Sequence, residues 1–166
     1  MSRPTEILSN DHKLVLTKLN VMEQSINDIK SPGAKKILAD LKEFFEKDVK
    51  LHFVKEEEAL FPEIEKFIPR DAGPVGVMLM EHEDLYKYEG NFFKGVALWL
   101  KDDNNMEAIK LIKENGRSYI NLLREHIYKE DNMLFMMEEM HLDEAQIQNM
   151  AALFSEIDKR YLVSKK

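Results

Sequence analysis

Residues 52–61 read HFVKEEEALF, and residues 126–135 read HIYKEDNMLF. The two segments share the pattern H-x-x-K-E-x-x-x-L-F and are identical at five of ten positions. In each segment a glutamate follows a histidine by four residues, which puts the two side chains on one face of an α-helix. The repeat predicts an αα-hairpin that is duplicated around a shared centre.

The rest of the chain has a helical pattern. Apolar residues recur every three or four positions between a few short turn signals. We expect five helices, at about residues 4–30, 32–67, 74–101, 104–140 and 143–162. Ser31 followed by Pro32, and Asp143, fit the start of a helix, and Pro62 is expected to kink or end the straight part of the second helix.

Long helices that are joined by short turns pack as antiparallel neighbours. The predicted fold is therefore all-α: an up-down-up-down four-helix bundle with a short C-terminal fifth helix. We expect a single domain over residues 1–166, with a core at about residues 8–140 and the extra helix at about residues 143–162. A weaker similarity between Asp11-His12 and Glu81-His82 relates the first helix to the third.

Composition excludes several classes of protein. The 166 residues include no Cys, so disulfides, Cys-ligated zinc, iron–sulfur clusters and thiol catalysis are excluded for this chain. A net charge of −7 without a basic cluster argues against nucleic-acid binding. No apolar stretch approaches the roughly 20 residues of a membrane span, and the first residues lack an apolar signal core. We expect a cytoplasmic protein without a membrane partner.

The apolar stripe of each long helix carries a histidine, and two stripes also carry a glutamate. These residues are His12, His52, Glu56, His82, His126 and Glu130. Each one alone fits a hydrogen-bonded core histidine or a surface ion pair, but the joint pattern favours a buried metal site. Burial of an unpaired carboxylate costs several kcal/mol, and two cations would remove that cost. Imidazole suits iron, zinc, copper and nickel, carboxylates bridge two metals, and this set leaves coordination positions open.

The order H … H-x-x-x-E … H … H-x-x-x-E, with Leu60-Phe61-Pro62 after the first pair, resembles the hemerythrin-like (HHE cation-binding) domain. The resemblance covers about residues 8–140. It implies a non-haem di-iron centre with an oxo or hydroxo bridge, for which zinc is a substitute. The implied terminal ligands are His12, His52, His82 and His126, and the implied bridging carboxylates are Glu56 and Glu130.

Two positions depart from the oxygen-carrying members of that family. They have H-x-x-x-H on the third helix, where this chain has Tyr86 four residues after His82. Tyr86 is a phenolate ligand, a hydrogen-bond donor to a bound oxygen, or a core residue. They also end in H-x-x-x-x-D, whereas this chain offers both Glu130 and Asp131. A fifth residue is rotated about 140° from His126 and a fourth only about 40°, so Glu130 is the predicted ligand and Asp131 is expected to face solvent or to lie behind the ligands.

The remaining candidates have simpler interpretations. We expect Glu57 and Glu58 to be solvated, and His141 to lie in a turn away from the site. The methionines at positions 133, 136, 137 and 140 are expected to fill the core.

The resemblance implies binding of, or reaction with, a small diatomic or peroxide ligand (oxygen, nitric oxide or hydrogen peroxide) in sensing or stress defence. Tyr86 in place of a fifth histidine weakens the case for reversible oxygen carriage. Two alternatives are an iron-donating protein that repairs damaged iron–sulfur or di-iron centres, and a bundle in which iron or zinc is purely structural. Whether the protein is an enzyme, and its oligomeric state, do not follow from the sequence.

Overall fold

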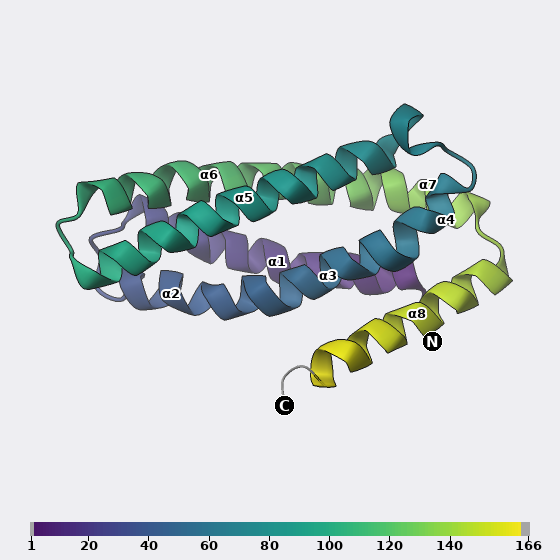
Figure 1. Cartoon of the computed structure of the whole chain (residues 1–166), viewed down its shortest axis with the longest axis horizontal. Coiled ribbons are helices and arrows are strands. Elements are labelled where there is room, and N and C mark those ends of the chain that lie inside the picture. Colours follow the sequence, from purple (N-terminus) through teal and green to yellow (C-terminus); the bar gives the residue numbers. More distant parts are fainter. Residues whose placement is uncertain (1, 164–166) are drawn as a thin grey trace.

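The computed structural model describes residues 2–163, and this part of the chain is helical without a strand. Four long helical rods run antiparallel, and a shorter helix follows them (Figure 1). The first rod is α1 (Pro4–Asn27), and the third is α5 (Pro74–Lys101). The second rod consists of α2 (Ala34–Phe44), η1 (Phe45–Val49), α3 (Lys50–Lys55), η2 (Glu56–Leu60) and α4 (Phe61–Glu65). The fourth consists of α6 (Met106–Lys129), η4 (Glu130–Leu134) and α7 (Phe135–His141). The shorter helix is α8 (Glu144–Val163), and a 3₁₀ turn, η3 (Arg70–Ala72), precedes α5. The predicted all-α bundle with a short C-terminal helix is confirmed.

The buried apolar residues form two clusters along the length of the bundle. One cluster includes Leu19, Ile26 and Phe45, and the other includes Leu8 and Phe61. Along every rod, the histidine lies at the junction between residues of the first cluster and residues of the second. The bundle therefore has two apolar halves with a polar layer between them.

Helix α8 packs against the outside of the bundle. It contacts α3, η2 and α1, and in Figure 1 it runs back beneath α3 from the end of α7. Phe154 and Ile157 bury their side chains in this contact, and Asp158 forms a 2.9 Å ion pair with Lys55. Asp143 caps α8 as expected, since its carboxylate accepts a 2.8 Å hydrogen bond from the backbone N–H of Gln146.

The expected start of the second rod at Pro32 is wrong. The helix begins at Ala34, after a turn in which the Ala34 N–H donates to the carbonyl of Ser31 at 3.2 Å. Gly33 has φ 88°, a left-handed conformation that glycine adopts at little cost. Because Ser31 and Pro32 form this turn instead of a helix cap, the helix starts two residues later than the Ser-Pro pair suggested.

Two π-helical turns begin at the glutamates of the repeat, η2 at Glu56 and η4 at Glu130. Pro62 lies two residues beyond η2, and the chain stays helical through it until Glu65. The position equivalent to Pro62 in the second repeat is Met136, which follows η4 in the same way. Proline is therefore not required for these turns. Single π turns in α-helices are frequent at functional sites.

Candidate metal centre

The structure brings the six predicted residues together in the polar layer between the two apolar clusters. His12 lies on α1, His82 on α5, and each of the other two rods supplies one histidine and one glutamate. All six side chains are buried. Their ligand atoms form two groups, each within 4.8 Å: His12, His52, Glu56 and Glu130 in one, and Glu56, His82 and His126 in the other.

The four imidazoles form two pairs. In one pair the Nε2 atoms of His12 and His52 lie 3.1 Å apart, and in the other those of His82 and His126 lie 3.2 Å apart. Each pair joins one histidine that precedes a glutamate in the repeat with one that does not. The pairs therefore follow the pseudo-two-fold relation between the two halves of the chain.

Each glutamate reaches one histidine of each pair. Glu56 places one carboxylate oxygen 2.9 Å from His52 Nε2 and the other 3.1 Å from His82 Nε2. Glu130 Oε1 lies 3.1 Å from His126 Nε2 and 3.4 Å from His12 Nε2. The two carboxylates thus stand between the two histidine pairs.

A further carboxylate holds the outer nitrogen, Nδ1, of each of the four histidines in the cluster. The four contacts are Asp131 with His12 (2.9 Å), Asp11 with His52 (3.0 Å), Glu57 with His82 (2.8 Å) and Glu81 with His126 (2.7 Å). An ionised carboxylate only accepts hydrogen bonds, so each Nδ1 carries a proton, and a ring that loses its second proton to a metal ion directs the Nε2 lone pair inward. Such carboxylate–histidine pairs orient metal ligands and raise their basicity.

This outer set follows a pattern in the sequence. Asp11 and Glu81 each directly precede a histidine, and Glu57 and Asp131 each directly follow a glutamate of the repeat. The expectation that Glu57 is merely solvated is wrong. Glu57 is rotated by about 100° from Glu56 around the helix axis, and its carboxylate contacts His82 on the neighbouring rod. Asp131 lies behind His12, which was one of its two expected positions. Glu58 is exposed, as expected.

The electrostatics of the cluster are dominated by the two inner carboxylates. Burial alone would lower the pKa of His52, but Glu56, Asp11 and Glu130 outweigh it and raise that pKa to about 10. Burial likewise opposes the charge on Glu56, but the facing imidazoles lower its pKa. Without a metal ion, protons on the imidazoles therefore balance the carboxylates. Cations can replace those protons.

The donor set fits two cations. Among residues 2–163, none of the four oxygens of Glu56 and Glu130 makes a hydrogen bond of acceptable geometry, although imidazole nitrogens lie close to them. The lone pairs are therefore free to bind a cation. A cavity of about 10 Å³, lined by three of the histidines and Glu130, lies at the cluster. Four imidazole nitrogens with two carboxylates are borderline and hard donors that suit first-row transition metals.

Tyr86 lies outside this inner set. Its side chain is 37% exposed, and its ring stands edge-on to Phe53 at 5.8 Å. Phe53 in turn stacks on His82 at 4.0 Å. Burial, with the charges of Glu57 and Glu89, raises the pKa of Tyr86, so the free side chain is a phenol. Its role as a ligand stays a prediction.

His141 is remote from the site, as expected: it is exposed, and its ring stacks on Phe67 at 4.5 Å. The expectation that the methionines fill the core is wrong for three of them. Met133, Met136 and Met140 are 58%, 59% and 81% exposed, respectively. They lie on the outer side of η4 and α7. The helical period alone did not show which of the methionines face outward.

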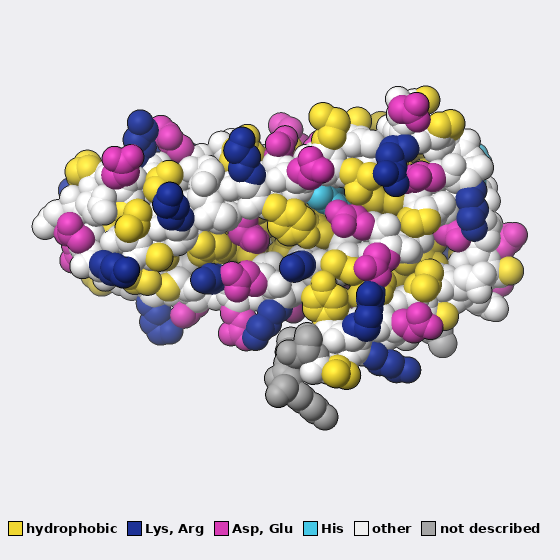
Figure 2. Space-filling model, in the orientation of Figure 1, with side chains coloured by type: hydrophobic (Ala, Val, Ile, Leu, Met, Phe, Trp, Pro, Cys, Tyr) yellow, Lys and Arg dark blue, Asp and Glu magenta, His cyan; other side chains and the backbone are white. Residues whose placement is uncertain are grey.

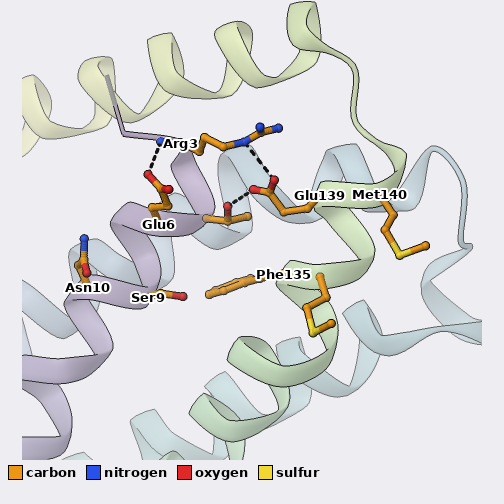
Figure 3. Close-up of a pocket in the computed structure, with 9 residues that line it drawn as sticks. Arg3, Glu6, Ser9, Asn10, Phe135, Glu139 and Met140 are labelled. Atoms are coloured by element: carbon orange, nitrogen blue, oxygen red, sulfur yellow. Dashed lines mark hydrogen bonds and ion pairs between the residues drawn. The ribbon is translucent and has the colours of Figure 1, made fainter.

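An open pocket of about 690 Å³ lies next to the centre, between α1 and α7 (Figure 3). Ser9, on its wall, donates a 2.7 Å hydrogen bond to Asp131. Phe135, on its floor, stacks on His12 with 5.7 Å between ring centroids. One layer of side chains therefore separates this pocket from His12.

On the face of α5 and α3, a histidine is visible among hydrophobic and acidic side chains (Figure 2).

The fold and the site define a class of protein: a four-helix bundle whose buried histidine–glutamate cluster can hold metal ions. The model of the hemerythrin HHE cation-binding domain matches residues 3–138, and the chain belongs to this family. Neither a curated protein nor a solved structure matches the chain. Within the described residues, every helix is too short or too polar to cross a membrane.

Proposed function

We propose that the protein binds two iron ions in this cluster and that the centre binds or reacts with a small diatomic or peroxide ligand. Iron bound by nitrogen and carboxylate donors supplies redox chemistry and open coordination positions. His12 and His52 would hold one ion and His82 and His126 the other. Glu56 and Glu130 would bridge them.

The observation that carries the proposal is the position of the two glutamates. Each carboxylate faces one histidine of each pair, at 2.9–3.1 Å for Glu56 and 3.1–3.4 Å for Glu130. A surface ion pair would not place a buried carboxylate between two buried imidazole pairs. A carboxylate that bridges two cations has to contact both pairs, and Glu56 does so through its two oxygens and Glu130 through Oε1.

The enclosure of the centre supports a small ligand. The cavity at the cluster has a volume of about 10 Å³, and the ring of Phe53 covers His82. Only a ligand of a few atoms fits such a space without displacement of side chains. The pocket between α1 and α7 offers an approach that ends one side-chain layer from His12.

One observation favours a second candidate function, in which the metal is purely structural. The six residues are almost completely buried, so that solvent has little access to the centre. Zinc would serve this role as well as iron. A cytoplasmic role in sensing or stress defence stays a proposal, and so does iron donation to damaged centres, which the same experiment addresses.

The experiment is an anaerobic reconstitution with ferrous iron, followed by optical titration with oxygen, nitric oxide and hydrogen peroxide in separate runs. We expect two iron ions per chain and a visible spectrum that changes stoichiometrically with one of these ligands. A zinc-loaded sample is the control and should show no change. Full iron loading with no response to any ligand would reject the proposed function in favour of the structural role. Transfer of the iron to an added apo-protein acceptor would favour donation.

A further inference from the structure

A seventh buried ionisable residue, Glu138, lies on α7 beyond the centre. Its side chain is 0% exposed, and neither carboxyl oxygen has a hydrogen-bond partner among the described residues. Glu138 follows Glu130 by eight residues, a rise of about 12 Å along a helix. It therefore lies near the metal centre but apart from the ligands.

Packing does not require a carboxyl group at this position. The repeat makes Ile64 the equivalent of Glu138, since Ile64 follows Glu56 by eight residues. Ile64 is fully buried in the apolar cluster at this end of the bundle. A buried polar group without a partner is unfavourable where an apolar side chain fits. The carboxyl at residue 138 thus breaks the pseudo-symmetry of the chain at a cost in stability.

Glu138 lines a cavity of about 10 Å³ between α1, α7 and α8, which is about the volume that one water molecule occupies. The other polar residues on its wall are Thr5 and Glu139. The Thr5 hydroxyl donates to Glu139, which also pairs with Arg3 at 3.0 Å (Figure 3). Thr5 and Glu139 line the open pocket as well. The cavity and the open pocket therefore share two polar side chains on their walls.

The cavity is better suited to a proton and a water molecule than to a metal cation. Hard divalent cations take six or more oxygen ligands. Here only three side chains offer oxygen, and the charge of Glu139 is already balanced by Arg3. A water molecule needs only two to four polar partners.

The charges that act on Glu138 are negative. Burial is the largest cause that raises its pKa, and Glu139 on α7, Glu63 on α4, Glu56 on η2 and Glu130 on η4 add to it, so that the pKa is about 9. The nearby cation, Arg3, directly precedes α1 and is engaged by Glu139, and the residues that α8 contributes to the cavity wall are apolar. Glu138 therefore holds a proton at neutral pH.

We propose that Glu138 is an exchangeable proton-binding site that releases its proton, through the adjoining cavity, when cations bind between Glu56 and Glu130. This inference rests on the proposed metal binding. Two of the four carboxylates that favour the proton on Glu138 are the ones that cations would neutralise. Positive charge there would favour the ionised form, and the proton would pass to solvent along the side of Thr5 and Glu139.

The test is a calorimetric titration of the metal-free protein with zinc, which has no redox chemistry, at about pH 7 in buffers of different ionisation enthalpy. The comparison gives the number of protons released per chain. Glu138→Gln and Glu138→Ile are the variants, the second being the residue found at the equivalent position 64. Glu144→Gln, at an exposed position on α8, is the matched control. We expect both Glu138 variants to release roughly one proton fewer than the wild type and the control. Equal proton release would overturn the proposal.

Infrared spectroscopy of the metal-free protein separates this inference from the proposed function. At neutral pH the carbonyl stretch of protonated carboxylic acid should be stronger in the wild type than in Glu138→Gln, and the difference should persist at about pH 8, above the pKa of about 7 to which burial raises Glu89. An identical spectrum in the two proteins would overturn the proton site even if zinc binds. A band specific to Glu138 in a protein that binds no zinc would retain the proton site but reject both the coupling and the proposed metal centre.

Discussion

At the scale of single residues, the positions of Glu56 and Glu130 determine the chemistry. Both are fully buried, and imidazoles face them from both sides. Two buried carboxylates without compensating charge would be too costly to keep in an apolar bundle. Protons on the imidazoles supply the compensating positive charge in the metal-free protein, and we propose that bound cations supply it in the metal-loaded protein.

The outer carboxylates should affect how tightly the metal is held. Glu81 accepts from His126 Nδ1 and also pairs with Lys129, so its removal frees the ring of His126. We expect Glu81→Ala to weaken metal affinity by roughly 10–100-fold and Glu81→Gln, whose amide oxygen still accepts, to weaken it less. Competition with a chelator measures this affinity. Asp84→Asn, exposed on the same helix, is the control and should have no effect. Unchanged affinity in Glu81→Ala would show that the outer contact does not orient the ligand.

Tyr86 should influence the centre without determining whether metal binds. It is partly exposed and lies outside the six inner residues, so Tyr86→Phe should keep the fold and two metal ions per chain. If the hydroxyl reaches the metal or its ligand, the visible spectrum of the iron-loaded protein will shift. Spectra that superimpose would assign to Tyr86 only its packing against Phe53.

The six inner residues could be predicted from the sequence because each obeys a local rule. His52 with Glu56, and His126 with Glu130, have the spacing of one helical turn, and the repeat relates the two pairs. The partner of each outer carboxylate could not be predicted in this way. Glu57 bonds to a histidine on another rod, and that contact depends on how the rods are rotated about their axes.

At the scale of elements, the π turns η1, η2 and η4 are the main departure from regular helices in the described part of the chain. Of these, η2 and η4 each begin at an inner glutamate and shift the backbone hydrogen-bond register there. Residue propensities contain no signal for such a shift, so the sequence predicted unbroken helices with a kink at Pro62. The second helix was predicted to start two residues too early for a related reason, since Ser31-Pro32 has the composition of a helix cap and only the backbone conformation excludes it.

Pro62 should be dispensable for the centre. It is exposed, and η4 forms without a proline at the equivalent position, Met136. We therefore expect Pro62→Ala to retain two metal ions per chain and the helical circular dichroism of the wild type. Metal analysis together with the far-ultraviolet spectrum checks this expectation. A loss of bound metal would mean that the proline sets the geometry of η2.

At the scale of the whole molecule, the bundle is two related helical hairpins that meet at the polar layer. The symmetry extends to the outer carboxylates and ends at Glu138, whose counterpart is Ile64. The fold class and the number of helices followed from periodicity, because a bundle of long amphipathic helices has few ways to bury its stripes. Where α8 docks did not follow from periodicity, since its contacts lie on the outside of the bundle.

We propose that residues 1–166 unfold as one domain, with α8 as part of it. Phe154 is buried between α8 and the bundle, so Phe154→Ala should destabilise the whole protein by about 3–5 kcal/mol. Thermal unfolding of the metal-free protein should keep a single transition at a lower midpoint. Leu153→Ala, at a largely exposed neighbour, is the control and should change the midpoint little. A separate early transition, with the main one unchanged, would make α8 an independent appendage.

The most direct test of the central claim is the number of metal ions bound per chain in the wild type, Glu56→Ala and Glu130→Ala. Elemental analysis after reconstitution and removal of loosely bound metal gives this number, with exposed Glu58→Ala as the control. We predict two ions for the wild type and the control, and well below two for each of the other variants, because each carboxylate contacts both histidine pairs. Full loading of both variants, or a wild type that retains no metal, would contradict a centre in which Glu56 and Glu130 bridge two ions.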